Sequence, residues 1–503
     1  MLLIAIIGVL VIGGLAAWLS EGRNRDWPKW ISLLAIGLAS LLLVPLFSLQ
    51  PVEMALAGST SEWLLVYQAP WIPRFGISFL FALDGLSLLM VALTIFLGLV
   101  ALASSWHEIE IQPGFFQFNL LLTLAGVVGV FVSLDLFLFF FFWEVMLIPM
   151  YFLIAIWGHE KKAYASMKFF LFTQISGLFM LVSIITLVFT AETTLGKYTF
   201  SYFDLVGLNL DPGISWWLML GFFIAFVVKL PGFPFHTWLP DAHTQAPTAA
   251  SVLLAGILLK TGAYGLLRFT VPLFPEASMD IAWVAMLLGA IGVVYGAVQA
   301  FAQDDFKRLV AYSSVSHMGF VLIGIFAWRE LTLQGSVMQM VAHGLSTAAL
   351  FMMAGAIQHR LHTRDMSEMG GLWMDMPRMG AIAMFFIIAS LGMPGLGNFV
   401  GEFMVLLGTF QVDVPITILA ALGIIGAAVY SLIAMQRVFQ GAPRANRNLQ
   451  DFDSREVCTM VLMMLGLVYL GVHPQPVFDL VDPTLRSLYQ LTNPEHAWIG
   501  SAG

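Results

Sequence analysis

Residues 221–243 read GFFIAFVVKLPGFPFHTWLPDAH and place a charged group beside a break in an apolar run. The run extends from Gly221 to Val228 and is followed by Lys229, and then by Pro231 and Pro234. Proline lacks a backbone N–H and clashes with the preceding turn, so the stretch predicts a helix that ends here. A lysine inside an apolar segment is costly and is by default a candidate functional group.

The composition indicates that lipid, not water, surrounds most of the chain. Of 503 residues, 59% are hydrophobic and 10% are charged, whereas soluble domains carry about 25% charged residues. Apolar runs of about 20 residues, the length that crosses a bilayer, recur about fourteen times. The sequence therefore predicts an all-α membrane protein. The expected helices are 1–20, 29–50, 78–105, 114–133, 135–157, 164–190, 214–235, 248–270, 281–301, 306–327, 331–358, 378–408, 414–436 and 456–473.

The remaining segments are too polar to span. We expect residues 51–77 and the tail from Pro474 to lie along the surface, and the loop 359–380 to be a connector or a subunit contact. Residues 1–20 lack a basic leader and are long enough to span, which favours a first membrane helix over a signal peptide. The single cysteine, Cys458, excludes an internal disulfide and an all-cysteine frame for an iron–sulfur cluster. No Lys/Arg run of the kind that binds nucleic acid is present.

The distribution of basic residues predicts the orientation. With both termini outside, fifteen of the 22 lysines and arginines fall in cytoplasmic segments and five in outer segments, a strong inside bias. Lys229 and Lys260 are left over as the two basic residues expected inside the membrane. The cytoplasmic set is Arg23, Arg25, Lys29, Lys161, Lys162, Lys168, Lys307, Arg308, Arg360, Arg364, Arg378, Arg437, Arg444, Arg447 and Arg455, and the outer set is Arg74, Lys197, Arg268, Arg329 and Arg486.

A weak internal repeat accompanies the break. FFIAFVVKLPG at 222–232 aligns without gaps with FFIIASLGMPG at 385–395, and both copies interrupt an apolar run with Pro-Gly. The two copies lie five expected helices apart, so their spans run in opposite directions. Interrupted helices at corresponding places in inverted halves point to a transport site.

Two charged groups, Glu144 and Lys229, allow two interpretations. One is a static ion pair that locks two helices together. The other is proton transfer. A nearby carboxylate stabilises a protonated buried lysine, and movement of the carboxylate away from the lysine favours release of the proton. The broken helix would free backbone carbonyls that hold water beside the amine. We favour proton transfer, because breaking a helix is a poor way to gain rigidity.

Other isolated polar residues lie in the predicted spans. Lys260 sits within SVLLAGILLKTGAYGLL, with no acid within one turn. His317 and His343 each allow two interpretations: a link in a proton path, or a packing residue held by hydrogen bonds. Glu402 follows Pro394 by eight residues and is the natural far end of a polar seam between the two broken helices.

Weaker patterns receive a structural interpretation. His236, Asp241 and His243 in HTWLPDAH are more compatible with a polar mouth or a helix cap at the membrane edge than with a metal site. Asp84 and Asp135 lie near expected span ends and are interpreted as exposed interface residues.

Four stretches carry a family resemblance. They are FFFFFWEVMLIPMYFLI around Glu144, the opening stretch around Lys229, QAPTAASVLLAGILLKTGAYGLLRF and KRLVAYSSVSHMGFVLIGI. Together they resemble the antiporter-like, proton-translocating subunits of respiratory complex I, the NADH–quinone oxidoreductase of bacteria, and the likeness covers nearly the whole chain. Glu402 on the second broken helix, where related subunits usually carry a lysine, favours one branch of this family.

The resemblance implies two inverted five-helix bundles, each with a discontinuous helix. It implies that Glu144 pairs with Lys229, that Lys260 links the halves, that His317 and His343 continue the path and that Glu402 serves the exit half. It also implies an inner-membrane protein among other membrane-arm subunits, with FMN, iron–sulfur clusters and quinone in those partners and no cofactor or metal in this chain. The implied divisions are 1–112, 113–270 with helices 4–8, 281–440 with helices 9–13, and 441–503 with the last helix and an amphipathic tail.

Two rival functions remain at this point. One is a subunit of a multi-subunit Na⁺/H⁺ antiporter that works without redox chemistry. The other is a structural scaffold whose buried charges only hold helices together. Removal of the charge at Lys260 distinguishes a scaffold from a proton-translocating subunit, because a scaffold would lose assembly before it loses transport.

Overall fold

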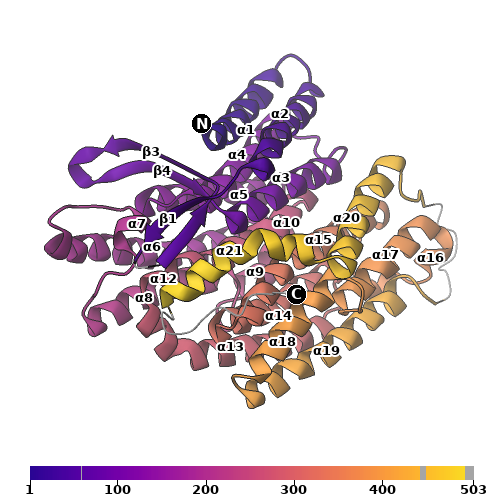
Figure 1. Ribbon diagram of the computed structural model, residues 1–503. Coiled ribbons are helices and arrows are strands. Elements are labelled where there is room, and N and C mark those ends of the chain that lie inside the picture. Colours follow the sequence, from indigo (N-terminus) through magenta and orange to yellow (C-terminus); the bar gives the residue numbers. More distant parts are fainter. Residues whose placement is uncertain (58, 442–448, 493–503) are drawn as a thin grey trace.

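The chain forms a large helical bundle in a computed structural model, which describes residues 1–57, 59–441 and 449–492 (Figure 1). Within these residues 13 helices are long and apolar enough to cross a membrane. The shorter apolar helices α17 (Pro377–Ser390) and α18 (Gly397–Phe410) correspond to the remaining expected span. The prediction of an all-α membrane fold with about 14 spans is thus confirmed. Arg444 and Arg447 of the predicted cytoplasmic set lie outside the described residues.

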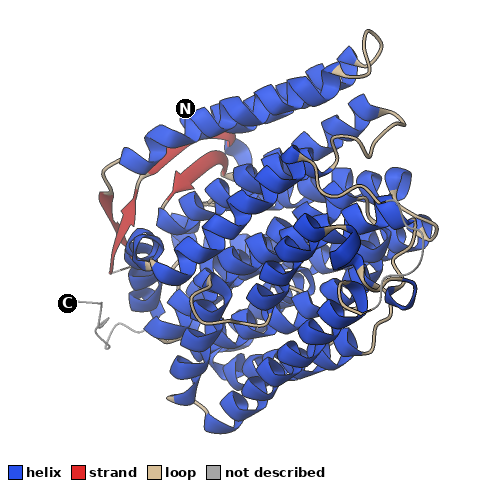
Figure 2. Ribbon diagram, turned by 90° about the vertical axis from the view of Figure 1, so that its right-hand side faces the viewer, coloured by secondary structure: helices blue, strands red, loops and turns tan. Residues whose placement is uncertain are grey.

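The N-terminal part contains three helices and two antiparallel β-hairpins. Figure 2 shows the strands gathered at one end of the helical bundle. The expected helix 78–105 is wrong in its first turns, because residues 77–83 form a strand paired with residues 65–72. A short apolar run does not distinguish a buried strand from a helix. The elements are α1 (Leu2–Ser20), α2 (Trp27–Leu43), the 3₁₀ turn Val44–Ser48, β1 (Val52–Leu56), β2 (Ser59–Trp63), β3 (Leu65–Ile72), the 3₁₀ turn Pro73–Phe75, β4 (Ile77–Leu83) and α3 (Gly85–Ser104).

The next part contains the first broken helix, which comprises α8 (Pro212–Lys229) and α9 (Trp238–Gln245). α8 ends at Lys229, directly before the prolines. The carbonyl of Val228 accepts a hydrogen bond from the Trp238 indole at 2.9 Å, so one carbonyl freed by the break is already bonded to protein. The other helices here are α4 (Pro113–Val132), α5 (Leu136–Trp157), α6 (Lys162–Leu195) and α7 (Tyr202–Leu205).

A central helix, residues 248–273, follows α9 and is buried along its whole length. It contains α10 (Thr248–Leu253), α11 (Leu259–Gly265) and α12 (Val271–Leu273), which are joined by the π-helical turns Leu254–Leu258 and Leu266–Thr270. π turns inside α-helices occur frequently at functional sites. No sequence pattern indicated these two.

The following part contains the second broken helix. Between α17 and α18 the chain passes through Gly392 and Gly395, whose φ angles are +83° and +93°, a backbone region that glycine adopts without strain. The other helices are α13 (Pro275–Phe301), α14 (Phe306–Ala327), α15 (Glu330–Leu361), the 3₁₀ turn Met366–Glu368, α16 (Leu372–Asp375) and α19 (Val414–Val438).

The chain closes with α20 (Ser454–Val472) and α21 (Gln475–Thr492). α21 crosses the bundle and packs against α3, α15 and β2 (Figure 1). The tail from Pro474, expected at the surface, is therefore a helix up to Thr492 that ties elements of both ends of the sequence together.

Candidate functional site

Lys260 lies on α11, between the two π-helical turns. Its side chain is 0% exposed. The Nζ atom donates a hydrogen bond to the carbonyl of Ala255 and lies 2.7 Å from Nδ1 of His343 on α15. The lysine therefore contacts the histidine that the sequence placed 83 residues away.

The polar contacts continue from His343 to Glu402. The rings of His343 and His317 stand edge to face, with centroids 5.7 Å apart. Nδ1 of His317, on α14, lies 2.6 Å from Oε1 of Glu402 on α18. All three side chains are at most 3% exposed. The structure therefore brings four of the six candidate residues into one buried row, Lys260–His343–His317–Glu402.

Three further side chains complete this row, and the sequence analysis missed them. Gln339 donates from Nε2 to Oε1 of Glu402 at 2.8 Å. Ser390 and Tyr430 each place a hydroxyl 3.2 Å from Nε2 of His317. The available signal was the presence of single polar residues in apolar helices, but which of them meet depends on the helix packing.

The second helix break positions the end of the row. Ser390 is the last residue of α17, and Glu402 lies in the second turn of α18, so the two polar groups approach His317 from the two halves of one broken helix. A Cβ at Gly392 would lie 3.3 Å from Oε2 of Glu402, which is tighter than usual contact. The break therefore leaves room for the carboxylate.

Lys229 and Glu144 lie in the other half and do not make the direct contact that the resemblance implies. No ion pair within 4.0 Å joins them in the described part of the chain, although they interact electrostatically at longer range. Lys229 is 1% exposed, and its Nζ has no hydrogen-bond partner among the described atoms. It lies over the rings of Trp143 and Phe169, at 5.4 and 5.5 Å from their centroids.

Glu144 is half-buried on α5, with Gln174 of α6 as a side-chain hydrogen-bond partner. Its Oε1 lies 3.1 Å from the position that a Cβ on Gly177 would occupy. The carboxylate therefore lies in a gap in the α6 surface that a larger residue at position 177 would close.

The three polar residues of HTWLPDAH do not meet at one site, and each contacts a different partner. Asp241 pairs with Lys168 of α6 at 2.6 Å. The ring of His236 lies 4.9 Å from that of Tyr295, and His243 stacks on Phe351 at 4.3 Å. No group of three or more His, Cys, Asp or Glu side chains that could hold a metal occurs among the described residues.

The interpretation of Asp84 and Asp135 as exposed residues is wrong. They are 2% and 0% exposed. Asp84 caps α3 and forms a buried ion pair with Arg268. Asp135 caps α5 and accepts a 2.8 Å hydrogen bond from the backbone of Ser78 in β4.

Two further basic residues, which the sequence analysis placed near span ends, are buried within the bundle. Arg268 is 2% exposed, held by Asp84. Lys307 is 1% exposed and donates to the carbonyl of Ala246 at 2.6 Å. The sequence analysis counted Arg268 in the outer set and Lys307 in the cytoplasmic set, each near the end of an expected helix. Burial there depends on which elements fold over them.

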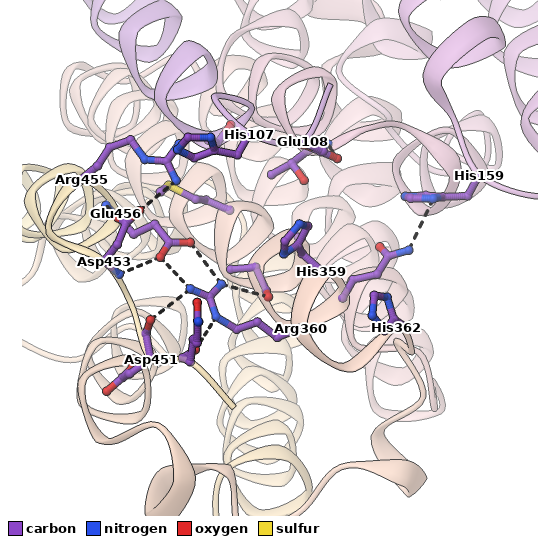
Figure 3. Close-up of a pocket in the computed structure, with 17 residues that line it drawn as sticks. His107, Glu108, His159, His359, Arg360, His362, Asp451, Asp453, Arg455 and Glu456 are labelled. Atoms are coloured by element: carbon purple, nitrogen blue, oxygen red, sulfur yellow. Dashed lines mark hydrogen bonds and ion pairs between the residues drawn. The ribbon is translucent and has the colours of Figure 1, made fainter. Parts of the chain in front are cut away.

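A polar cavity of about 560 Å³ lies where α3 and α15 end and α10 and α20 begin (Figure 3). Arg360 binds Glu456 with two hydrogen bonds of 2.7 and 3.1 Å on one side. On another side, Oε1 of Glu108 accepts a 3.1 Å hydrogen bond from the backbone of Thr248, the first residue of α10. The cavity therefore reaches the start of the helix that carries Lys260. Its labelled lining residues are His107, Glu108, His159, His359, Arg360, His362, Asp451, Asp453, Arg455 and Glu456.

His159 in this cavity provides a pH prediction. Burial and, to a smaller extent, nearby positive charges lower the pKa of His159 from 6.5 to about 4. The charges belong to Lys307, Arg364 and Lys162. The folded chain thus keeps this imidazole neutral, whereas the unfolded chain protonates it below pH 6.5, so acidification toward pH 4 favours unfolding. We expect the Tm of the purified protein complex to fall across this window, and His159→Gln to flatten the fall. An identical pH slope in both proteins contradicts this assignment.

Comparisons with known proteins agree on one family. The family described as NADH:quinone oxidoreductase/Mrp antiporter, TM, matches residues 133–428. NADH-quinone oxidoreductase subunit M of Pseudomonas aeruginosa is 52% identical, covering 98% of this chain and 96% of the relative. The subunit M of Escherichia coli K12 is 50% identical, covering 97% and 98%. Glu402 had favoured one branch of the family, and this branch is subunit M.

Solved structures give the same result. A chain of respiratory complex I from Thermus thermophilus with bound NADH matches with a TM-score of 0.88 and 31% identity, covering 98% of this chain and 100% of the other. A chain of the Mrp complex from Dietzia sp. matches with a TM-score of 0.82 and 22% identity, covering 99% of this chain and 53% of the other, which shows the shared fold alone. The chain belongs to the subunit M family of NADH-quinone oxidoreductase, the antiporter-like membrane subunits of respiratory complex I.

Proposed function

We propose that this chain moves protons across the membrane through its buried polar row, driven by quinone reduction elsewhere in the complex. The observation that carries the proposal is the buried row of neighbouring side chains from Lys260 through His343 and His317 to Glu402. Each of these groups can both take up and release a proton, and all are withdrawn from solvent. Lys229 and Glu144 act as the switch at the other end of the row.

The row can be interrupted at one place. Lys260 reaches His343 directly, and His317 reaches Glu402 directly. Between the two rings no hydrogen bond is formed, and Nε2 of His343 has no partner among the described atoms. A ring rotation or one bridging water joins the two halves of the row. Moving one charge against 100 mV takes about 2.3 kcal/mol, so a path that opens and closes is needed to prevent leakage.

Glu402 is held at the end of the row by contacts on two sides. Its Oε1 lies 2.6 Å from Nδ1 of His317 and accepts a 2.8 Å hydrogen bond from Gln339. Ser390 and Tyr430 place hydroxyls 3.2 Å from the other ring nitrogen of His317. The carboxylate is thus positioned to exchange a proton with the His317 ring.

The finer organisation follows the same proposal. The two repeats comprise 113–270 and 281–440, preceded by 1–112 and followed by 441–503, of which 442–448 and 493–503 lie outside the described residues. FMN, iron–sulfur clusters and quinone belong to partner subunits. Both termini face the periplasm, which places the Figure 3 cavity on the cytoplasmic side as the access route toward Lys260.

Lys260→Met tests the proposal against a scaffold role. Methionine keeps the length and loses the charge, so we expect the complex to assemble and NADH-driven proton output per complex to fall by about a hundredfold, the lower end for loss of a proton-transfer group. Proton uptake by vesicles and the amount of assembled complex are measured together. Lys197→Met, which removes an exposed lysine paired with Asp204, is the matched control. A scaffold predicts the reverse: lost assembly, with normal output from whatever assembles.

A further inference from the structure

The buried helix of residues 248–273 begins at the Figure 3 cavity, and a buried ion pair lies near its other end. Arg268, in the second π-helical turn, pairs with Asp84, the residue that caps α3. Both side chains are 2% exposed. Lys260 lies between the two ends of the helix. A proton on Lys260 therefore has two directions in which to leave, along the row to His343 or along its own helix to this ion pair.

Two hydroxyl groups extend the polar contacts from the ion pair toward Lys260. Tyr264 lies four residues after Lys260 on the same face of α11. Its hydroxyl lies 3.2 Å from that of Ser87 and donates to the carbonyl of Phe131 at 2.9 Å. The backbone N–H of Ser87 donates to the carboxylate of Asp84 at 2.9 Å. Four residues of α-helix rise about 6 Å, a gap that water can bridge, so a polar branch leads from Lys260 toward Asp84.

The two acids that can be reached from Lys260 differ in the partner that holds each carboxylate. Glu402 lies 2.6 Å from His317, an imidazole that can take up and release a proton. Asp84 is held by Arg268, and a guanidinium stays protonated in proteins. A permanent cation beside a carboxylate disfavours proton uptake, and this cation has no proton to give up. The branch toward Asp84 therefore ends at a pair that does not exchange protons.

Aromatic rings and α21 pack around the ion pair and fix its position. The guanidinium lies over the rings of Trp63 in β2 and of Tyr264, at 5.2 and 5.5 Å from their centroids. α21 packs against both α3 and β2 (Figure 1). At Gly85, the first residue of α3, an added Cβ would overlap the carbonyl of Leu480 in α21. Elements from both ends of the sequence thus hold the pair in place.

We propose that the Asp84–Arg268 pair is a proton barrier that closes this branch and directs protons from Lys260 along the row to Glu402. The inference rests on the proposed function, because a barrier is needed only if Lys260 carries protons. An open branch would join Lys260 to the side of the membrane opposite the Figure 3 cavity without passage through the second half of the chain. Protons would then return down their gradient, and the energy of quinone reduction would be lost.

The test measures passive proton leak through the whole assembled complex in proteoliposomes, with an imposed pH gradient and without NADH. Arg268→Met leaves the Asp84 carboxyl buried without its cation, so it can take up and release protons. We expect the leak per assembled complex to rise by about a hundredfold, the lower end of what one positioned proton-transfer group contributes. Arg268→Lys keeps an ion pair but introduces an amine that can release its proton, so it should leak as well.

Three further variants distinguish a barrier from general loosening of the structure. Arg268→Met combined with Asp84→Asn removes both charges and keeps a residue that caps helices, so the leak should return to the wild-type level. Arg268→Met combined with Lys260→Met should also show no added leak, because the branch starts at Lys260. Arg486→Met is the matched control. It breaks an exposed ion pair with Asp482 on α21 and should not leak.

Wild-type leak in assembled Arg268→Met or Arg268→Lys overturns the proposal. Equal leak with and without Asp84→Asn also overturns it and assigns the pair to structure alone. A leak that persists with Lys260→Met does the same, because the protons then follow another path. Normal NADH-driven output in Lys260→Met alone defeats the proposed function, whereas reduced output there together with a tight Arg268→Met defeats only the barrier.

Discussion

Replacing Lys229 by methionine is expected to abolish NADH-driven proton output while leaving the chain at least as stable as the wild type. Lys229 is fully buried and its amine has no hydrogen-bond partner among the described atoms. Removing an unsatisfied buried polar group returns about 1–3 kcal/mol. The contacts with the Trp143 and Phe169 rings offset part of this gain, because cation–π contacts contribute about 0.5–2 kcal/mol.

Two measurements on one preparation check this expectation. Proton uptake by vesicles that contain the assembled complex should fall by at least about tenfold, and the Tm should stay level or rise. Glu144→Gln is the companion variant: it keeps the side-chain shape and the contact with Gln174 but removes the charge that acts on Lys229. We expect a similar loss of output. A lower Tm together with normal output in Lys229→Met would assign Lys229 to structure instead.

Replacing Glu402 by glutamine is the second large effect that we expect. One carboxylate oxygen, Oε1, lies 2.6 Å from Nδ1 of His317 and accepts a hydrogen bond from Gln339 at 2.8 Å. A neutral amide cannot take up or release a proton, so the row would lose its last proton-transfer group. We expect proton output to fall by about tenfold or more.

Glu402→Asp distinguishes the effect of the negative charge from the effect of the side-chain length. Aspartate keeps the charge but withdraws it by one methylene, so it should restore part of the output that Glu402→Gln loses. Gln339→Leu keeps the charge and removes the positioning hydrogen bond, and should have a smaller effect than either. Equal proton output from Glu402→Gln and the wild type, with normal assembly, rules out a role for this carboxylate in transfer.

The sequence predicted the helices well where length and apolar character sufficed. The helix expected at 306–327 occurs at Phe306–Ala327, and both breaks lie at the predicted Pro-Gly pairs. Residues 78–83 were assigned to a helix because a short apolar strand carries no distinguishing period. That error also affected Asp135, whose carboxylate accepts hydrogen bonds from Ser78 in the unpredicted strand β4.

The candidate site was predicted as a set of residues but not as an arrangement. Lys260, His343, His317 and Glu402 stood out because polar side chains in apolar helices are costly. Their order depends on how α11, α14, α15 and α18 pack, and no spacing along the chain encodes it. Gln339, Ser390 and Tyr430 were missed for the same reason. The direct Glu144–Lys229 contact implied by family resemblance is absent from the described residues, where two aromatic rings flank the amine instead.

The complete burial of residues 248–273 constrains how a ribosome can deliver this chain to the bilayer. Each charge on a lone segment adds about 2.5–3.5 kcal/mol to the free energy of insertion, and this segment carries Lys260 and Arg268. Asp84, the ion-pair partner of Arg268, is synthesised before Arg268, so it is already present when Arg268 emerges. His343 emerges 83 residues after Lys260, so the nascent segment must remain sheltered by the translocon or by its earlier neighbours until α15 arrives.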